Sequence, residues 1–358
     1  MSPRKTNPHW TWIVPVAGLL VIGAAILLPG ALTASIAGLA LVGAVITAVH
    51  HAEVVAHRVG EPFGTLVLAV AVTVIEVALI VSVMLSAGGG KEAVARDTVF
   101  AAIMICCNGI VGLCLLVGGM RHHEQGFQVQ GASSALAVLC ALAGLSMVLP
   151  SYSSSAPGAG LTASQLVFAG VISLVLYLMF VFVQTIRHRD YFLADPGDAD
   201  GHADPPPNSV AMASFGWLVV ALVAVVGLAK VLSPVVERAV EAVGAPEAVV
   251  GIVIATLVLM PEGTAAVRNA RTDHLQNSLN LALGSALASI GLTIPTVAVV
   301  SILMDRPILL GLMPKEVLLL ALTLIISVIT LGTGRTTVLQ GVVHLAIFAA
   351  FLFFAFVP

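Results

Sequence analysis

The sequence predicts an all-α integral membrane protein with eleven transmembrane helices. Of its 358 residues, 59% are hydrophobic and only 9% are charged, which is more apolar surface than a water-soluble domain needs. A helix that spans a bilayer requires about 20 mainly apolar residues, and the chain offers a succession of such runs. The runs lack the alternating segments of about ten residues that are typical of a transmembrane β-barrel.

The apolar runs give the bounds of the expected helices. The first two are separated only by Pro29-Gly30, a dipeptide typical of tight turns. The first run has no clear small-residue cleavage site, so we interpret it as a retained helix. The eleven helices are predicted near 12–29, 31–56, 62–86, 98–119, 131–149, 163–186, 210–232, 246–268, 275–303, 315–331 and 337–357.

One long polar segment, 187–209, divides the chain. It contains five aspartates and three consecutive prolines, a composition typical of linkers. We therefore predict an extra N-terminal helix at 1–30, a five-helix repeat at 31–186, the acidic Pro-rich linker, and a second five-helix repeat at 210–358. The linker lacks the residue order of an EF-hand, so regulatory Ca²⁺ binding there is left open beside a plain disordered loop.

The distribution of Lys and Arg predicts the orientation, because cytoplasmic loops carry an excess of both. With a cytoplasmic N-terminus, nine basic residues fall on the inner side and six on the outer side. The inner ones are Arg4, Lys5, Arg58, Arg121, Arg187, Arg189, Arg268, Arg271 and Arg335, and the outer ones are Lys91, Arg96, Lys230, Arg238, Arg306 and Lys315. The linker is then cytoplasmic and the C-terminus periplasmic or extracellular. Five spans in each half give the two halves opposite orientations.

Several classes of function are disfavoured. The net charge is −3 and no basic patch is present, so nucleic acid is not an expected partner. No Walker A, G-x-S-x-G or nicotinamide-binding motif is found, so we expect neither an enzyme with catalytic residues nor a bound cofactor. The four cysteines lie in apolar runs and are interpreted as small core hydrophobes; they are Cys106, Cys107, Cys114 and Cys140. The oligomeric state is left open.

Two glutamates lie inside hydrophobic runs: Glu76 within 60–85 and Glu262 within 244–267. A carboxylate at membrane depth is costly, and such residues usually mark an ion or proton path. No Lys or Arg lies near mid-depth to neutralise them, so both cannot stay ionised without protons or a cation. We predict Glu76 and Glu262 as the cation-, metal- and proton-binding residues. The alternative is a pair of buried structural carboxylates.

The stretches around the two glutamates look like copies of one unit. After Glu76 come Arg96-Asp97 and a run that contains GIVGL at 109–113. After Glu262 come Arg271-Thr272-Asp273 and a run that contains SIGL at 289–292. Duplicated acidic helices in oppositely oriented halves are typical of transporters with a site at the repeat interface.

Polar residues near these glutamates are candidates for lining a cavity. Thr73 precedes Glu76 by three residues, and Asn108 and Ser285 lie in the runs that follow the glutamates. A hard cation such as Ca²⁺ takes six to eight oxygen ligands, so hydroxyl, amide, backbone and water oxygens would have to complete a site. Ordinary interhelical hydrogen bonding is the alternative for all three. A lone His344 in the last run is interpreted as a packing residue whose hydrogen bonds are satisfied.

A second polar cluster lies at the end of the second run. If the helix continues, His50, Glu53, His57 and Glu61 share one face. Because histidine titrates between about pH 5 and 8, this face is a candidate for proton access or pH sensing. A solvated helix end is the alternative.

These motifs resemble those of a known family. The stretches 51–79 and 95–119, together with Met260-Pro261-Glu262 and Leu283-Gly284-Ser285, are similar to the bacterial ChaA-type calcium/proton antiporters of the cation/Ca²⁺ exchanger superfamily. The resemblance implies eleven spans with two inverted five-helix repeats and proton-driven export of Ca²⁺, with Na⁺ or K⁺ also transported in ChaA-type members. It places the acidic pair of the family on Glu76 and Glu262.

The chain lacks amide side chains that the eukaryotic vacuolar members carry near their acidic residues. Those relatives carry Gly-Asn before each acidic residue, whereas this chain has Val74-Ile75 and Met260-Pro261, and Ala288 stands where they carry Gln. The sequence thus predicts a Ca²⁺/H⁺ antiporter of the bacterial inner membrane. A Na⁺(K⁺)/H⁺ antiporter that uses the same acidic pair is the alternative, and an intramembrane enzyme is disfavoured.

Overall fold

The structure, a computed structural model, describes residues 8–60, 63–84, 91–154, 160–193, 205–242, 244–305 and 307–357. It confirms the all-α class: within this part of the chain, eleven helical segments are long and apolar enough to cross a membrane. Seven are single helices, namely α1 (Trp10–Leu27), α2 (Ala31–Val59), α3 (Phe63–Met84), α8 (Asn208–Ala242), α9 (Ala248–Arg271), α12 (Pro314–Leu331) and α13 (Val338–Phe356).

The other four segments are long helices with a change of winding. Each contains a π-helical stretch, where the backbone hydrogen bonds are one residue longer than in an α-helix. They are α4–η2–α5 (Val94–Met104, Ile105–Ile110, Val111–His122), α6–η3–η4 (Val129–Ala143, Gly144–Val148, Leu149–Tyr152), α7–η5 (Ala163–Phe182, Val183–Arg187) and α10–η8–α11 (Leu275–Ala288, Ser289–Thr293, Ile294–Met304). Short elements complete the fold: η1 (Lys91–Ala93), η6 (Arg189–Phe192), β1 (Gln125–Gly126) and β2 (Arg335–Thr336).

Some observed helices extend beyond their predicted ends. Helix α8 continues to Ala242, well beyond the predicted end at 232, with Pro234 inside it. Hydropathy marks only the apolar part of a helix, so it misses a polar continuation of this kind. The predicted linker begins as ordered structure, because η6 buries Phe192. Residues 194–204 lie outside the described residues, and the predicted linker aspartates there are Asp195, Asp198, Asp200 and Asp204.

The chain forms two compact units, each built from both sequence halves. The first unit comprises Met1–Lys91 and Asp200–Val250, and the second comprises Glu92–Ala199 and Gly251–Pro358. The predicted repeats are continuous in sequence, so they do not coincide with these units. The division into repeats remains a prediction.

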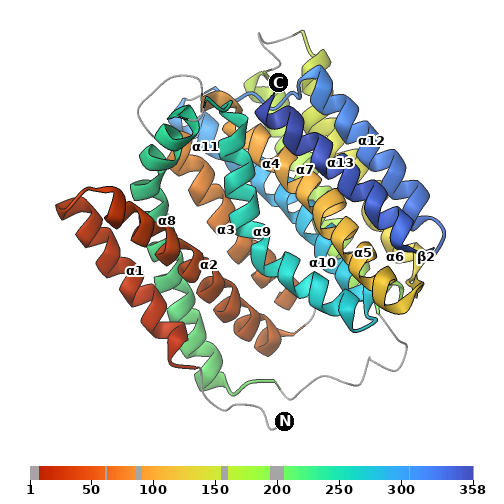
Figure 1. The fold of residues 1–358 in the computed structure, drawn as a ribbon, viewed down its shortest axis with the longest axis horizontal. Helices are drawn as coiled ribbons and strands as arrows, with labels where there is room; N and C mark the ends of the chain where they lie inside the picture. Colours follow the sequence, from red (N-terminus) through yellow and green to blue (C-terminus); the bar gives the residue numbers. More distant parts are fainter. Residues whose placement is uncertain are drawn as a thin grey trace. The chain divides into compact units, whose positions relative to one another are not determined.

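In the first unit, α1, α2 and α8 lie side by side (Figure 1), and α3 packs against α2 and α8. The start of α8 is tied to the end of α2 by a hydrogen bond of 2.6 Å from Arg58 Nε to Asn208 Oδ1. Small residues bring these helices together, as is common in membranes. Gly18 of α1, for example, faces Ala224 and Leu228 of α8.

In the second unit, the contacts pair corresponding elements of the two predicted repeats. Helix α13, the last of one repeat, packs against α5, while α7, the last of the other, packs against α11 (Figure 1). Strand β1 pairs antiparallel with β2, and an isolated bridge joins Gly160 to Leu309 at the opposite end of α6. The two repeats therefore make equivalent contacts: α13 with α5 corresponds to α7 with α11, and β1 with β2 corresponds to the Gly160–Leu309 bridge.

The two sequence motifs that suggested duplication lie at these crossings. A Cβ atom on Gly112, from GIVGL, would stand 3.0 Å from Cβ of His344 in α13. A Cβ atom on Gly291, from SIGL, would collide with Tyr177 of α7. Each glycine thus permits the last helix of the opposite repeat to approach closely.

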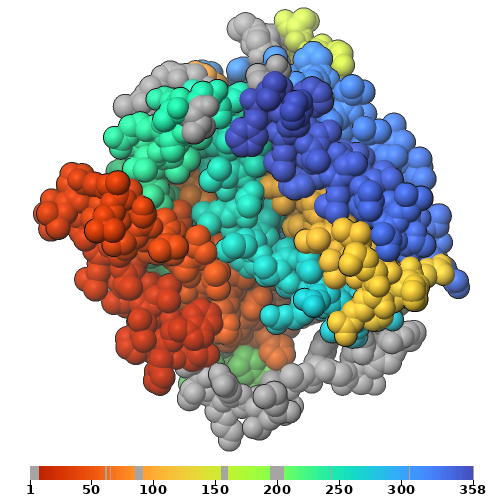
Figure 2. All heavy atoms as spheres, in the orientation of Figure 1, coloured from red at the N-terminus to blue at the C-terminus, as the bar shows by residue number. Residues whose placement is uncertain are grey.

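The surface is apolar where a bilayer would surround it. Exposed Leu, Ile, Val and Phe side chains occur along α1, α7, α12 and α13. Helices α12 and α13, in the two blue shades, lie next to one another in Figure 2. All four cysteines are free thiols, three of them buried, in agreement with their interpretation as core residues.

Candidate functional site

Glu76 is buried within the first unit. It lies past the middle of α3, with only 2% of its surface exposed. Thr73, one helical turn earlier, is also buried and shares its helix face. A carboxylate and a hydroxyl are therefore held together on one face of α3.

Glu262 is buried within the second unit, where 9% of its surface is exposed. It lies past the middle of α9, directly after Pro261, and the helix continues through this proline. Because proline has no N–H group, the carbonyl of Leu257 has no helical donor at that point. The Thr264 hydroxyl donates to the Pro261 carbonyl over 2.8 Å. The turn around Glu262 is therefore rich in oxygen atoms.

Helix α9 runs alongside the α4–η2–α5 helix in the same direction. A Cβ atom on Gly251 would stand 2.8 Å from the backbone of Asp97 and Thr98. A Cβ atom on Gly263 would stand 3.3 Å from Cδ1 of Ile110. These two close approaches, one toward each end of α9, fix the register of the two helices.

The register places Asn108 at the level of Glu262. Gly263 directly follows Glu262, and Ile110 follows Asn108 by two residues. The structure therefore brings one predicted lining residue to the depth of one predicted carboxylate, on adjacent helices of one unit. The remaining predicted residues, Glu76 and Thr73, belong to the other unit.

Asn108 is fully buried and is hydrogen-bonded to other helices. Its Nδ2 atom donates to Thr323 Oγ1 of α12 over 2.8 Å, and its Oδ1 atom lies 3.2 Å from Nδ1 of His344 in α13. The other ring nitrogen of His344 lies 3.2 Å from Thr330 Oγ1. The interhelical hydrogen bonding considered as the alternative for Asn108 is thus present, and its role as a lining residue stays a prediction.

His344, expected as a lone but satisfied packing residue, is buried and satisfied, and it belongs to a polar network. The side chain is fully buried and both ring nitrogens lie within hydrogen-bonding distance of polar partners. Sequence reasoning missed this network because its partners come from three different helices. The sequence did offer one signal: His344 is an ionisable residue inside a hydrophobic run, and such residues are rare and usually functional.

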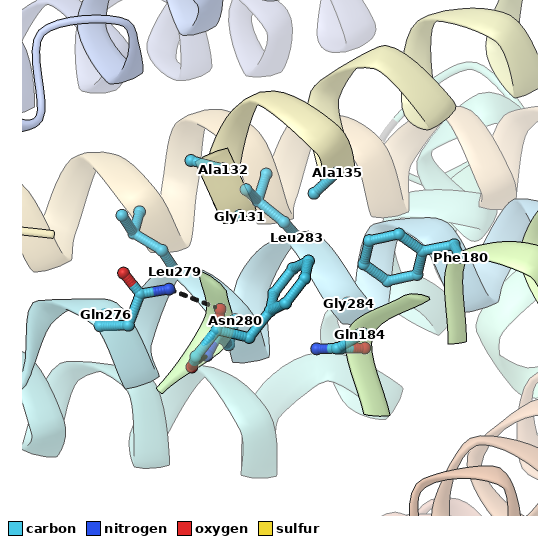
Figure 3. Close-up of a pocket in the computed structure, with 11 residues that line it drawn as sticks. Gly131, Ala132, Ala135, Phe180, Gln184, Gln276, Leu279, Asn280, Leu283 and Gly284 are labelled. Carbon is cyan, nitrogen blue, oxygen red and sulfur yellow. Dashed lines mark hydrogen bonds between the residues drawn. The ribbon is translucent and has the colours of Figure 1, made fainter. Parts of the chain in front are cut away.

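Ser285 is half-buried in α10 and directly follows Gly284, which lines a small, mainly apolar pocket. This pocket is lined by Gln184 of η5, Gln276 and Asn280 of α10, and small or apolar residues of α6 and α10 (Figure 3). Gln276 Nε2 donates to Asn280 Oδ1 over 3.0 Å, and Asn280 Nδ2 donates to the Phe192 carbonyl over 2.6 Å. With an accessible volume of about 10 Å³, the pocket has room for about one water molecule.

The predicted histidine face lies on the last turns of α2. His50 is half-buried and its ring lies 5.3 Å from that of Trp10, while Glu53 and His57 are exposed. The neighbouring His51 is buried, with Nε2 3.0 Å from the Thr11 carbonyl. Glu61 lies outside the described residues. The helix does continue to Val59, as the predicted face requires, and the role of the face stays a prediction.

Side-chain contacts with loops anchor the starts of α4 and α10 in the second unit. Arg96 Nη2 lies 2.7 Å from Asp97 Oδ1, and Arg96 Nη1 donates to the Gly311 carbonyl. At the corresponding point of the other repeat, Gln125 Nε2 donates to Asp273 Oδ1 over 2.7 Å. These contacts join each helix start to a loop of the opposite repeat.

No group of three or more His, Cys, Asp or Glu side chains within the described ranges is placed to hold a metal ion. A cation bound near Glu262 or Glu76 would therefore depend on hydroxyl, amide, carbonyl and water oxygens as well as carboxylate. That mixed oxygen set is the kind that hard cations accept.

Comparison with known proteins supports this description. The model of the family "Sodium/calcium exchanger protein" matches residues 27–186 and 213–357. The protein y4hA of Sinorhizobium fredii is 53% identical over 98% of this chain and 97% of that protein. The sodium-potassium/proton antiporter ChaA of Escherichia coli is 34% identical over 98% of this chain and 96% of that protein.

A solved structure agrees in fold. The structure of native YfkE superimposes with a TM-score of 0.75 at 17% identity, covering 97% of this chain and all of that one. The matches confirm the eleven-helix fold, the inner-membrane location as a multi-pass protein, and the expectation of a secondary transporter instead of an enzyme. The chain belongs to the sodium/calcium exchanger family, in the cation/Ca²⁺ exchanger superfamily, and is a secondary cation antiporter.

Proposed function

We propose that this antiporter exchanges Ca²⁺ for protons, and that Glu76 and Glu262 bind the cation and the protons in turn. The N-terminus and the linker lie in the cytoplasm and the C-terminus lies outside. Protons enter down their gradient, neutralise the carboxylates and release the cation outward. Cytoplasmic cation then displaces the protons.

One observation carries the proposal: each predicted repeat has a carboxylate buried past the middle of its second helix. Glu76 is 2% exposed and Glu262 is 9% exposed. Burial makes the charged form costly, so a carboxylate in such a place favours a proton or a bound cation. Competition between these two occupants at one group is what couples their fluxes. That both carboxylates serve one site is inferred from the order of the repeats in the sequence.

Charge balance favours a divalent cation. One Ca²⁺ and two protons carry the same charge, so either can neutralise the two glutamates completely. One Na⁺ neutralises only half of that charge and requires a retained proton. Ca²⁺ also gains most from additional oxygen ligands, which the turn around Pro261 and the side chains of Thr73, Asn108 and Ser285 can supply.

A second function has its own support. The chain lacks the Gly-Asn amides that precede the acidic residues in vacuolar relatives, and a 34% identical relative is named a sodium-potassium/proton antiporter. Exchange of Na⁺ or K⁺ for protons by the same glutamates is therefore the alternative. We expect such an activity to be weaker than Ca²⁺ exchange and to be strongest at alkaline pH.

Purified protein in pH-loaded proteoliposomes tests the proposal. Glu76→Gln and Glu262→Gln are each expected to abolish ⁴⁵Ca²⁺ uptake driven by a proton gradient, because each removes a ligand and a proton carrier. Glu124→Gln is the matched control, since that carboxylate is half exposed in a loop beside Arg335. Uptake near the wild-type rate by either buried variant would remove that glutamate from the coupling site.

Parallel uptake of ²²Na⁺ and of a K⁺ tracer separates the two functions. Calcium exchange with little monovalent flux at neutral pH supports the main proposal. Robust Na⁺ exchange, with no Ca²⁺ flux and no inhibition of Na⁺ flux by Ca²⁺, would replace it by the alternative.

A further inference from the structure

We propose that His50 and His51 of α2 bind a transition-metal ion of the kind that imidazole prefers, such as Zn²⁺. We call this the paired-histidine site. It lies within the first unit and involves neither Glu76 nor Glu262, so it does not rest on the proposed function. Its basis is two ring nitrogens, one on each histidine, that are buried and lack a hydrogen-bond partner within the described residues.

A proline on the neighbouring helix explains the tautomer of His51. Pro15 lies inside α1 and has no N–H group, so the Thr11 carbonyl has no helical donor four residues further on. His51 is fully buried and takes that place, with Nε2 3.0 Å from the Thr11 oxygen. A carbonyl oxygen can only accept, so Nε2 carries the proton, and Nδ1 of the neutral ring presents a lone pair.

This lone pair of His51 is what a metal ion requires. Nδ1 has no hydrogen-bond partner in the part of the chain that the structure describes, whereas buried polar atoms are normally paired. A proton on Nδ1 would not remove the deficit, because it would leave a buried charge with an unpaired N–H group. Histidines that bind metals usually donate their other ring N–H to a carboxylate, a backbone carbonyl or water. His51 already does so to Thr11.

His50 supplies the second nitrogen. Its side chain is half-buried, and its Nε2 atom is buried without a hydrogen-bond partner among the described residues. The centres of the two histidine rings lie 5.6 Å apart. Two imidazoles on one tetrahedral zinc ion, each with a Zn–N distance of about 2.0–2.1 Å, have ring centres roughly 5 Å apart. The observed spacing is close to this value, so one ion can bridge the two rings with a rotation of the His50 side chain.

Two protein ligands leave the other coordination positions to water. Within the described ranges, no third His, Cys, Asp or Glu joins the two histidines in a metal-binding group. Structural zinc sites have four protein ligands and catalytic sites have three, so the paired-histidine site should bind more weakly and exchange its ion with solvent. Cu²⁺ binds a given set of nitrogen ligands more tightly than Zn²⁺ does. Ca²⁺ prefers oxygen ligands and should not bind there.

The site has a natural reporter beside it. The ring of Trp10, at the start of α1, lies 5.3 Å from the ring of His50. Cu²⁺ quenches the fluorescence of a nearby tryptophan, so binding should reduce the emission of Trp10. An ion on Nδ1 of His51 also withdraws electrons from the ring, which makes Nε2–H a stronger donor to the Thr11 carbonyl. Occupation of the site should therefore strengthen the contact between α1 and α2.

Titration of the full, tag-free chain in detergent tests the proposal. Calorimetry should show saturable binding of Zn²⁺ that excess Ca²⁺ does not displace, and Cu²⁺ should quench tryptophan emission. His51→Gln keeps an NH₂ group for the Thr11 carbonyl but has no nitrogen lone pair, and His50→Gln removes the other ligand. Each should weaken Zn²⁺ binding at least about tenfold, the loss typical even of an outer partner of a metal ligand. His57→Gln is the matched control, because His57 is exposed on the same helix, and it should bind as the wild-type protein does.

Three results would overturn the inference. The first is the absence of saturable Zn²⁺ binding by the wild-type protein. The second is the same Zn²⁺ affinity in His50→Gln as in His57→Gln; this comparison decides the test even if His51→Gln does not fold. The third is loss of Zn²⁺ binding in Glu76→Gln or Glu262→Gln with full binding in the histidine variants, which would place the ion at the carboxylates.

Discussion

Replacing Gly251 by Ala should weaken the packing that sets the register of α9. The new Cβ atom would stand 2.8 Å from the carbonyl carbon of Asp97 and 2.8 Å from the nitrogen of Thr98. Carbon atoms in favourable contact are about 3.5 Å apart. Because the opposing atoms are backbone, they cannot rotate away, so α9 must withdraw by about 0.7 Å at this end.

The expected net effect follows from two opposing contributions. Overpacking of this kind typically costs about 1–3 kcal/mol, and Ala improves helix propensity over Gly by about 1 kcal/mol. We therefore expect Gly251→Ala to destabilise the protein by up to about 2 kcal/mol. Gly216→Ala in α8 is the matched control, because a Cβ atom there meets nothing within 4 Å, and it should be neutral or stabilising.

Thermal unfolding in detergent, followed by tryptophan fluorescence, measures the difference. The midpoint of Gly251→Ala should lie below that of the wild-type protein, and the midpoint of Gly216→Ala at or above it. Exchange activity should fall in the first variant alone, since a shift of α9 also moves Glu262. Equal stability of the two variants would refute the close approach of α9 and the register derived from it.

Three further predictions follow from the site and its surroundings. Arg96→Ala should destabilise the protein by about 1.5–3 kcal/mol, because it removes the ion pair with Asp97 and the hydrogen bond to the Gly311 carbonyl; an unchanged unfolding midpoint would contradict this. A cysteine within 195–205 should react with an impermeant thiol reagent only from the cytoplasm, and one at the C-terminus only from outside, whereas labelling of both from one side would reject the inverted repeat. Transport should fall at acidic cytoplasmic pH if this face controls proton access, because histidine is the side chain that gains charge there, and a double substitution of His50 and His57 by Gln should flatten that part of the profile. An unchanged profile would support the alternative, a solvated helix end with no role in access.

The long helices of the second unit are held at their starts by loops of the opposite repeat. Loops of one repeat hold the helix starts of the other, through Gln125 with Asp273 and through Arg96 with Gly311. Each long helix is therefore anchored by the opposite half of the sequence.

The sequence by itself determined the membrane class, the helices and the two glutamates. Whether a segment enters the bilayer depends on how favourable it is to move about 20 consecutive residues from water into lipid. This is a local property of the sequence. The cost of burying a charge is likewise evident from its immediate neighbours, so Glu76 and Glu262 stand out before any packing is known. The turn at Pro29-Gly30 was predictable for the same reason.

Only the tertiary structure decided which residues meet. Asn108 and His344 are 236 positions apart in the sequence, and nothing local to either indicates the other. Their contact depends on α13 crossing α5 at glycines, and the depth of Asn108 relative to Glu262 depends on the packing of α9 against Asp97 and Ile110. Hydropathy carries no information on these crossings, because in a bilayer every face of a helix can be apolar. Side-chain shape and hydrogen bonding choose among the faces, and these act only once the helices are packed.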